Sequence, residues 1–269
     1  MKNYLFMGLT AIALFITSCQ KTAENEILIP DSSLELAATN NAESQMALES
    51  IEYLQDELLE SRDNGTCPEI TSTEPKGIFP NTVTIDYGAG CTDKKGRFHS
   101  GKIIIEQSDS LKNTGAIRRT MFADFGMDSM RIKNGEILLS HGQDANGNTQ
   151  FVRKTMALTF TGPKGTIEVN AHHIRTQIQG GETNEKSDDV WKMEGESTGT
   201  VDGNIKFQSM IKEALILKNS CPFIVSGKET ISRNGHEINI DFGDGSCDRL
   251  AKGTTENGKE LLIVLRPRF

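Results

Sequence analysis

The sequence predicts a mainly β fold: an antiparallel sheet, as a sandwich or an open barrel, preceded by one amphipathic helix. Strand-like runs follow one another from residue 67 to residue 269 with no helical pattern between them. Turn pairs such as Asn134-Gly135 and Asp202-Gly203 separate these runs, and 25 glycines stand against 7 prolines. Asn-Gly and Asp-Gly pairs favour tight hairpins, and short strands at regular spacing are typical of an all-β sandwich or barrel.

The first 18 residues have the pattern of a secretory signal peptide. A basic residue, Lys2, precedes an apolar run of 12 residues from Leu5 to Ile16. A membrane-spanning helix needs about 20 apolar residues, whereas a run of this length is typical of the apolar centre of a signal peptide. We therefore predict that residues 1–18 are removed during export and take no part in the fold.

The end of this segment, Ile16-Thr17-Ser18-Cys19, resembles the lipobox of bacterial lipoproteins. The resemblance implies that the Cys19 thiol carries a diacylglyceryl group, that Cys19 begins the mature chain, and that acyl chains such as palmitate join it to a membrane. Two or more acyl chains hold a protein stably on a membrane. Gln20 is not the aspartate that retains such proteins at the inner membrane. The resemblance therefore implies an outer-membrane lipoprotein that faces the periplasm or the cell surface.

A tether and a helix are predicted between the lipid and the sheet. Residues 19–39 are interpreted as a flexible tether. Residues 40–66 are interpreted as an amphipathic helix with its linker, in which Glu43–Arg62 is helical and Asn40 is available as the cap. The apolar stripe of this helix, spaced as on one helical face, consists of Leu48, Ile51, Leu54 and Leu58. We expect the stripe to pack on the sheet, because in a solvated stalk it would have no apolar partner.

Four of the 5 cysteines remain when Cys19 is set aside, and an even number in an exported chain indicates disulfides. Cys67–Cys91 and Cys221–Cys247 is the preferred pairing among three possibilities, because each pair lies within one copy of a repeated segment. Each bridge closes a loop of about 25 residues and contributes roughly 3 to 3.5 kcal/mol on the chain-entropy model. A zinc site is a poor alternative because no CxxC pair occurs.

The repeated segments occupy residues 67–107 and 221–265 of a β domain that spans residues 67–269. Each begins with a Cys-Pro pair, continues with an alternating strand that ends in Asp-aromatic-Gly, and reaches a second cysteine. Glycines at 96 and 101 in the first copy correspond in spacing to glycines at 253 and 258 in the second. Alternation of apolar and polar residues predicts a half-buried strand. We expect the two copies to close or cap the sheet.

Further strands are predicted between the two copies. They are runs of β-forming residues bounded by turn pairs, and they cover Ala116–Phe125, Glu136–Ser140, Phe151–Phe160, Thr166–Gln179, Val190–Val201 and Ile205–Met210.

Two short motifs match most of a phosphate-binding loop, GxxxxGK, at Gly96–Lys102 and Gly253–Lys259. That loop requires Ser or Thr at the next position and a strand before a helix. Here the next residues are Ile103 and Glu260, and the predicted context is a turn before a strand. Both motifs are interpreted as hairpin turns, so no cofactor is expected there.

Candidate metal ligands and catalytic groups are equally weak. The aspartates Asp241, Asp244 and Asp248 are able to bind calcium through oxygen ligands, but a surface turn that uses aspartate for backbone hydrogen bonds explains them equally well. His172 and His173 are adjacent in a predicted strand and therefore point to opposite faces. No nucleophile elbow or free cysteine nucleophile is present once the disulfides form. We therefore predict no catalytic residues, no metal and no cofactor.

The charge balance restricts the partners. A formal net charge of −8 argues against nucleic acid as a partner, and leaves room for an envelope protein or a glycan. As a whole the chain resembles uncharacterised β-rich lipoproteins of Bacteroidota, a resemblance that implies no activity. The leading hypothesis is a non-enzymatic binding or structural module. A hydrolase with a site assembled in space predicts convergent carboxylates with shifted pKa values, and a carrier of an apolar ligand predicts an apolar interior cavity.

Overall fold

The computed structural model describes residues 31–61, 67–93 and 96–268. Within these residues the chain forms one long helix and a single antiparallel sheet of 15 strands. The predicted fold class is therefore confirmed: the protein is mainly β with one helix at the N-terminal side. Of the two predicted forms, the single sheet corresponds to an open barrel. Its end strands, β1 (Glu69–Ser72) and β15 (Glu260–Val264), are not paired with each other in the described part of the chain.

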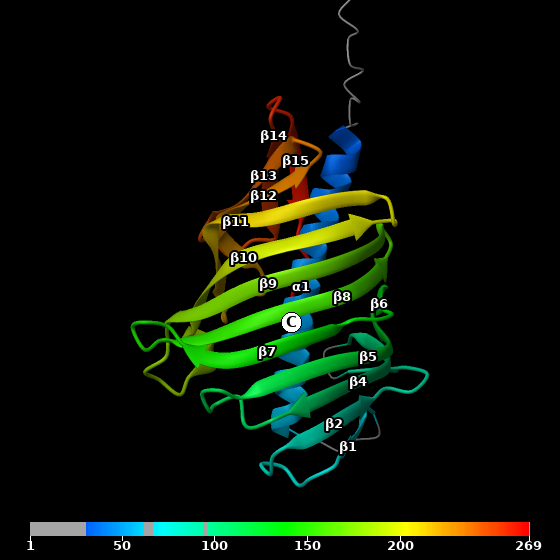
Figure 1. The fold of residues 1–269 in the computed structure, drawn as a ribbon, viewed down its shortest axis with the longest axis vertical. Coiled ribbons are helices and arrows are strands. Elements are labelled where there is room, and N and C mark those ends of the chain that lie inside the picture. Colours follow the sequence, from blue (N-terminus) through cyan, green and yellow to red (C-terminus); the bar gives the residue numbers. More distant parts are fainter. Residues whose placement is uncertain (1–30, 62–66, 94–95, 269) are drawn as a thin grey trace, which may run out of the picture.

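The elements follow one another mostly as a simple up-and-down meander (Figure 1). The helix is α1 (Asp31–Ser61), and a short 3-10 turn, η1 (Lys186–Asp188), lies between β9 and β10. The strands are β1 (Glu69–Ser72), β2 (Asn81–Asp86), β3 (Cys91–Thr92), β4 (Phe98–Gln107), β5 (Ile117–Met127), β6 (Met130–Ile132), β7 (Glu136–Gln143), β8 (Thr149–Gly162), β9 (Gly165–Gln179), β10 (Val190–Val201), β11 (Ile205–Lys218), β12 (Ile224–Arg233), β13 (His236–Asp244), β14 (Leu250–Thr255) and β15 (Glu260–Val264). β6 and β7 both lie between β5 and β8.

Bulges bend several of the long strands. The register between β10 and β11 shifts between Met193 and Glu196, and the register between β8 and β9 shifts between Thr155 and Leu158. Gly195 lies in the first of these bulges with φ of +134°, and a Cβ atom there would come within 2.1 Å of the His172 carbonyl oxygen. An extra residue in one strand bends it and increases its twist. The bulges therefore let the sheet curve around α1.

The helix occupies the inside of this curved sheet (Figure 1). In the view of Figure 1 the strands run across the axis of α1, with the first strands near its C-terminal end and the last strands near its N-terminal end. Every residue from Ser44 to Glu52 is buried. Because more than two full turns are buried all round, strands and the C-terminal segment must enclose α1 on every side. The hydroxyl of Ser50 accordingly donates to the carbonyl of Pro267 at 3.3 Å.

The start of the helix corrects one prediction. The helix begins at Asp31, so the predicted tether is wrong for residues 31–39. Asn40 is not an N-terminal cap: it lies inside the helix, where its side-chain amide donates to the Leu36 carbonyl at 2.9 Å. The physical reason is burial, because Leu34, Ala37 and Ala38 join the core and stabilise the first turns.

The predicted signal peptide, Cys19 and the first part of the predicted tether lie outside the described residues. No helix in the described part of the chain is both long and apolar enough to cross a membrane.

Both disulfides form with the preferred pairing, Cys67–Cys91 and Cys221–Cys247. Each cysteine pair joins the segment before one strand of a hairpin to the segment after its partner strand. The hairpin β1–β2 continues into β4, and the hairpin β12–β13 continues into β14, so the two copies share one neighbour order. The copies form opposite ends of the sheet. Disulfides of this kind indicate an oxidising compartment outside the cytoplasm.

The glycine part of the repeat does not correspond in space. Ile103 lies opposite Ile85 in the first copy, whereas Gly253 lies opposite Ile240 in the second. Gly253 therefore occupies the position in β14 that Ile103 occupies in β4. The sequence spacing had instead matched Gly253 with Gly96. The repeated unit ends within its third strand, and β15 has no counterpart in the first copy.

Candidate binding cleft

A row of polar residues on α1 faces the sheet. Its members are spaced by three or four residues, as one helical face requires, and all are buried: Asn41, Gln45, Glu49, Glu52 and Gln55. We call this set the polar row. An amphipathic helix that packs only its apolar stripe on the sheet would leave its acidic residues in water. Glu49 and Glu52 are buried instead, because the sheet encloses the helix and presents partners for these carboxylates.

The centre of the polar row is a buried ion cluster. Arg153 of β8 contacts Glu49 at 2.8 Å and Glu52 at 2.9 Å through the same guanidinium nitrogen. Arg175 of β9 contacts the other oxygens of the same carboxylates at 3.1 and 3.0 Å. Burial alone would raise the pKa of Glu49, but the charges of Arg175, Arg153 and Arg268 outweigh it and hold the pKa at about 2. The two guanidiniums and the two carboxylates of the cluster thus balance each other's charge.

His173 belongs to the same cluster. Its Nδ1 atom lies 3.1 Å from a guanidinium nitrogen of Arg153. Burial, followed by the positive charge of Arg153, lowers the pKa of His173 to about 3. The imidazole is therefore neutral at physiological pH and acts as a hydrogen-bond partner for the guanidinium.

Glu229 of β12 forms a second buried contact with the polar row. One carboxylate oxygen accepts hydrogen bonds from Asn41 and Gln45, each at 2.9 Å, and from the hydroxyl of Ser209. Burial raises the pKa of Glu229 to about 6, although the three hydrogen bonds act in the opposite direction. No lysine, arginine or histidine of the described residues forms an ion pair with Glu229, and its hydrogen-bond donors there are all neutral.

This pKa predicts a pH-dependent stability. A carboxyl group whose pKa is raised in the folded state stabilises the fold when the pH is below its ordinary pKa, here 4.5. That contribution is lost as the pH rises through the pKa of the folded state, about 6. The variant Glu229→Gln does not titrate at this position. We expect its free energy of unfolding, relative to the wild type, to increase by about 2 kcal/mol between pH 4 and pH 8. Urea denaturation at both pH values measures the difference, and the exposed Glu237→Gln change is the control. Parallel pH profiles for wild type and Glu229→Gln would contradict the assignment.

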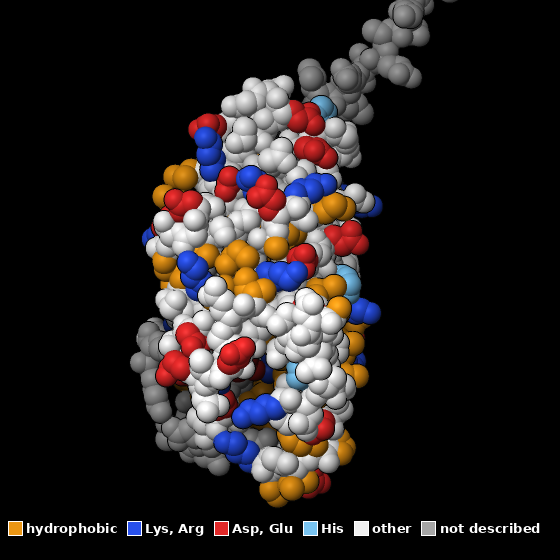
Figure 2. Space-filling model, turned by 90° about the vertical axis from the view of Figure 1, so that its left-hand side faces the viewer, with side chains coloured by type: hydrophobic (Ala, Val, Ile, Leu, Met, Phe, Trp, Pro, Cys, Tyr) orange, Lys and Arg blue, Asp and Glu red, His pale blue; other side chains and the backbone are white. Residues whose placement is uncertain are grey.

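A cleft of about 830 Å³ opens beside the C-terminal half of α1. Its lining comes from α1, the β1–β2 connection, the end of β4 and the turn after it, strands β5, β7, β8 and β9, and the 3-10 turn. The apolar members are Leu59, Phe79, Leu111, Leu139 and Phe151, and the charged members are Glu52, Asp56, Glu60, Lys76, Lys112, Arg118, Arg175 and Lys186. Figure 2 looks onto the side where these strand ends lie and shows a hollow in its lower half with charged and apolar side chains at the margin.

Phe151 lines the cleft, and two further rings that are not part of the lining pack behind it. The rings of Phe151 and Trp191 lie 5.8 Å apart, and the ring of His141 lies 5.0 Å from Phe151. The guanidinium of Arg175 lies 5.1 Å from the centre of the Trp191 ring, within cation–π distance. Both ring nitrogens of His141 are buried, and neither has a hydrogen-bond partner among the described residues. A group that enters the cleft therefore meets the ring of Phe151 and the guanidinium of Arg175.

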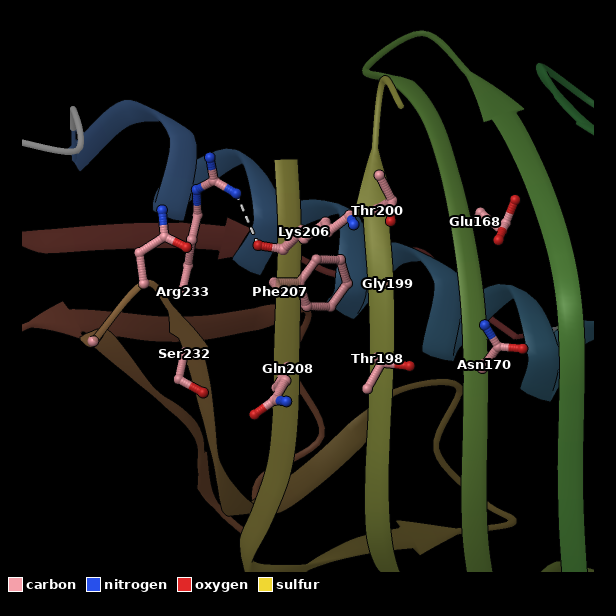
Figure 3. Close-up of a pocket in the computed structure, with 12 residues that line it drawn as sticks. Glu168, Asn170, Thr198, Gly199, Thr200, Lys206, Phe207, Gln208, Ser232 and Arg233 are labelled. Atoms are coloured by element: carbon pink, nitrogen blue, oxygen red, sulfur yellow. Dashed lines mark hydrogen bonds between the residues drawn. The ribbon is translucent and has the colours of Figure 1, made fainter. Parts of the chain in front are cut away.

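The outer face of the sheet carries a second concave surface, which we call the outer groove (Figure 3). It consists of two adjoining hollows of about 490 and 810 Å³ that share Asn170, Thr198, Gln208 and Ser232. In Figure 3 the helix passes behind these strands, on the opposite side of the sheet. The only aromatic residue of this lining, Phe207, is 3% exposed, so it provides no surface for stacking a ligand. The outer groove is open, and the charges on its residues are mixed.

Comparison with known proteins gives no relative. No protein family, curated protein or solved structure matched this chain. The assignment of a function therefore depends on the geometry of the cleft and on the chemistry of its lining.

The predicted metal and phosphate candidates have structural explanations. Asp241, Asp244 and Asp248 each accept a hydrogen bond from the backbone amide two residues later, as aspartates of a surface turn do. No group of three acidic, histidine or cysteine side chains suited to a metal occurs among the described residues.

In the phosphate-like motifs, Gly96 and Gly258 lie in turns as predicted, whereas Gly101 is inside β4 and Gly253 is inside β14. Lys102 pairs with Asp86 at 2.6 Å and Lys259 pairs with Glu35 at 2.5 Å.

The histidines also lie where structural roles explain them. His172 is exposed on the outer face and His173 is buried on the inner face, as predicted from their adjacency. His99 is fully buried, and its Nε2 atom lies 3.0 Å from an oxygen of Asp93. His236 is near Glu256 at the surface, at 3.5 Å. None of the sequence candidates lies in the cleft.

Sequence reasoning did not identify the residues that line the cleft. Leu139, Phe151 and Arg175 belong to predicted strands, but their shared position depends on how three strands are aligned side by side. One signal was present: Arg153 and Arg175 interrupt the expected apolar positions on the inner faces of β8 and β9, and an inward charge requires a partner.

Proposed function

We propose that this protein is a non-enzymatic, lipid-anchored binding protein of the cell envelope, and that its ligand occupies the cleft beside α1. The observation that carries the proposal is the cleft itself. Its volume of about 830 Å³ lies within the range of small-molecule sites. Its walls place five apolar side chains beside eight charged ones, so the cleft offers both apolar contact area and polar groups that orient a ligand.

The state of the buried charges supports binding rather than hydrolysis. A hydrolase needs a carboxyl group or an imidazole that is free to exchange a proton with the substrate. Glu49 and His173 have strongly shifted pKa values, but both are buried and held against Arg153. Their shifts are explained by the contact between α1 and the sheet.

The position of α1 supports an open cleft rather than a closed carrier cavity. A carrier that encloses an apolar ligand needs an empty apolar interior, whereas α1 fills the inside of this sheet with buried side chains from Leu34 to Leu54. The ligand of the cleft would lie at the side of the helix, partly exposed. The two disulfides and the lipobox pattern at Cys19 support the envelope location.

A blocking substitution tests this site. We expect the chain from residue 20 onward, which keeps every described contact, to bind the neutral apolar dye N-phenyl-1-naphthylamine saturably. The variant Leu111→Asp places a carboxylate on the apolar wall, and we expect it to weaken dye binding by about tenfold or more. Titration followed by dye fluorescence measures both dissociation constants.

Leu262→Asp is the matched control. Leu262 is 64% exposed on β15, is not part of the cleft lining, and receives the same change in charge. We expect this variant to bind the dye as the wild type does. Equal weakening by both substitutions, or no binding by the wild type, would rule out the cleft as the site.

A further inference from the structure

The cleft concentrates positive charge on an acidic protein. Five of its lining residues are lysine or arginine and three are acidic, whereas the whole chain has a formal net charge of −8. A concave surface with an excess of one charge attracts ligands of the opposite charge, because its low-dielectric walls focus the field. The cleft therefore favours an anionic group even though the protein as a whole repels one.

The acidic residues of the cleft do not cancel this excess. Asp56 contacts Arg118 at 2.5 Å, Glu60 contacts Lys186, and Glu52 is held in the ion cluster by Arg153 and Arg175. Each carboxylate is thus already paired with a cation. By contrast, no carboxylate of the described residues lies within ion-pair distance of Lys112.

Arg118 supplies a second group suited to an anion. Its side chain is 2% exposed, and its contact with Asp56 uses a single nitrogen, Nη1. A guanidinium has five N–H donors. The remaining donors of Arg118 therefore lie at the cleft with capacity for an anionic oxygen.

The apolar half of the lining lies beside these cations. Leu111 belongs to the same turn as Lys112, and Leu139 and Phe151 come from neighbouring strands. A ligand that touches both parts needs an apolar body with a charged end. A small inorganic anion would leave the apolar wall in water, and a neutral apolar molecule would leave the cations without a partner.

We infer that the ligand of the cleft is an anionic amphiphile, a molecule whose apolar body lies against Leu111, Leu139 and Phe151 and whose anionic group is bound by Lys112 and Arg118. This inference rests on the proposed function, because it names the ligand class of the same cleft. It goes beyond that proposal by requiring a negative charge on the ligand.

Two dyes that differ by one anionic group test the inference. The dye 8-anilinonaphthalene-1-sulfonate is N-phenyl-1-naphthylamine with a sulfonate added. We expect the wild-type chain to bind the sulfonate about tenfold more tightly than the neutral dye. The variant Lys112→Glu reverses one charge at the rim, and we expect it to weaken sulfonate binding about fivefold or more and to leave the neutral dye within about twofold.

Lys133→Glu is the control, because Lys133 is exposed in the turn before β7 and does not line the cleft. We expect it to leave both dissociation constants unchanged. If Leu111→Asp weakens both dyes but Lys112→Glu leaves the sulfonate constant unchanged, the cleft binds ligands and the anionic preference is wrong. If Leu111→Asp changes neither dye, the proposed function itself fails. Circular dichroism of each variant separates loss of binding from loss of fold.

Discussion

Replacing Arg153 by methionine is expected to lower the free energy of unfolding by about 3 to 5 kcal/mol. The guanidinium of Arg153 lies within 2.9 Å of both Glu49 and Glu52, and its side chain is 1% exposed. Methionine fills similar space but removes the charge, so two buried carboxylates would share Arg175 as their remaining close cation from the sheet. Leaving a buried charge without its partner is costly because water cannot reach it. Urea denaturation at pH 7 measures the change.

Arg119→Met is the matched control for this prediction. Arg119 also contacts two carboxylates, those of Glu106 at 3.4 Å and Glu136 at 2.6 Å, but its side chain is 44% exposed. We expect the free energy of unfolding to fall by less than about 1 kcal/mol, because water screens exposed ion pairs. A similar small loss for Arg153→Met would show that the buried cluster does not stabilise the contact between α1 and the sheet.

Replacing Cys19 by alanine in the full-length chain is expected to abolish incorporation of labelled palmitate and to remove lipid-dependent membrane binding. Each buried methylene of an acyl chain contributes about 0.8 kcal/mol to membrane binding, so two or three chains determine where the protein resides. Metabolic labelling followed by membrane fractionation measures both effects. Label on the wild-type protein is the essential observation, because an uncleaved signal peptide would also retain the alanine variant in a membrane.

The double variant Cys67→Ser, Cys91→Ser is the control for lipidation. It removes two cysteines and one disulfide but leaves Cys19 in place. We expect this variant to incorporate labelled palmitate as the wild type does. A wild-type chain without label would overturn the proposed anchor and leave the two disulfides as the support for an extracytoplasmic location.

The strands were predictable from local pattern because an antiparallel strand buries alternate residues. Val83, Ile85 and Tyr87 are all buried, as their alternation with polar residues predicted. Strand β12 was not predicted, and its sequence shows why. Glu229 points inward at an apolar position, and the bulge at Gly227 shifts the alternation by one residue. Local pattern cannot reveal a buried carboxylate whose partners, Asn41 and Gln45, are 188 and 184 residues away.

The prediction of the helix was incomplete, and the reason is related. Leu48, Ile51 and Leu54 are buried as their spacing predicted, but the acidic residues between them are buried too. An isolated amphipathic pattern implies one buried face, whereas an enclosed helix buries every face. The cleft could not be predicted at all, because its lining comes from turns and strand ends that only the register of the sheet brings together.

The position of α1 also determines how the chain folds. Contacts such as Asn41 with Glu229 and Ser50 with Pro267 join residues 188 and 217 positions apart. Proteins dominated by contacts of such long sequence separation fold slowly, because loop entropy must be lost before the contacts form. The helix α1 comes first in the chain, but its partners come last. Until those strands have formed, the leucines and carboxylates that α1 buries in the core are exposed. Apolar surface that is exposed in this way before folding is complete favours aggregation.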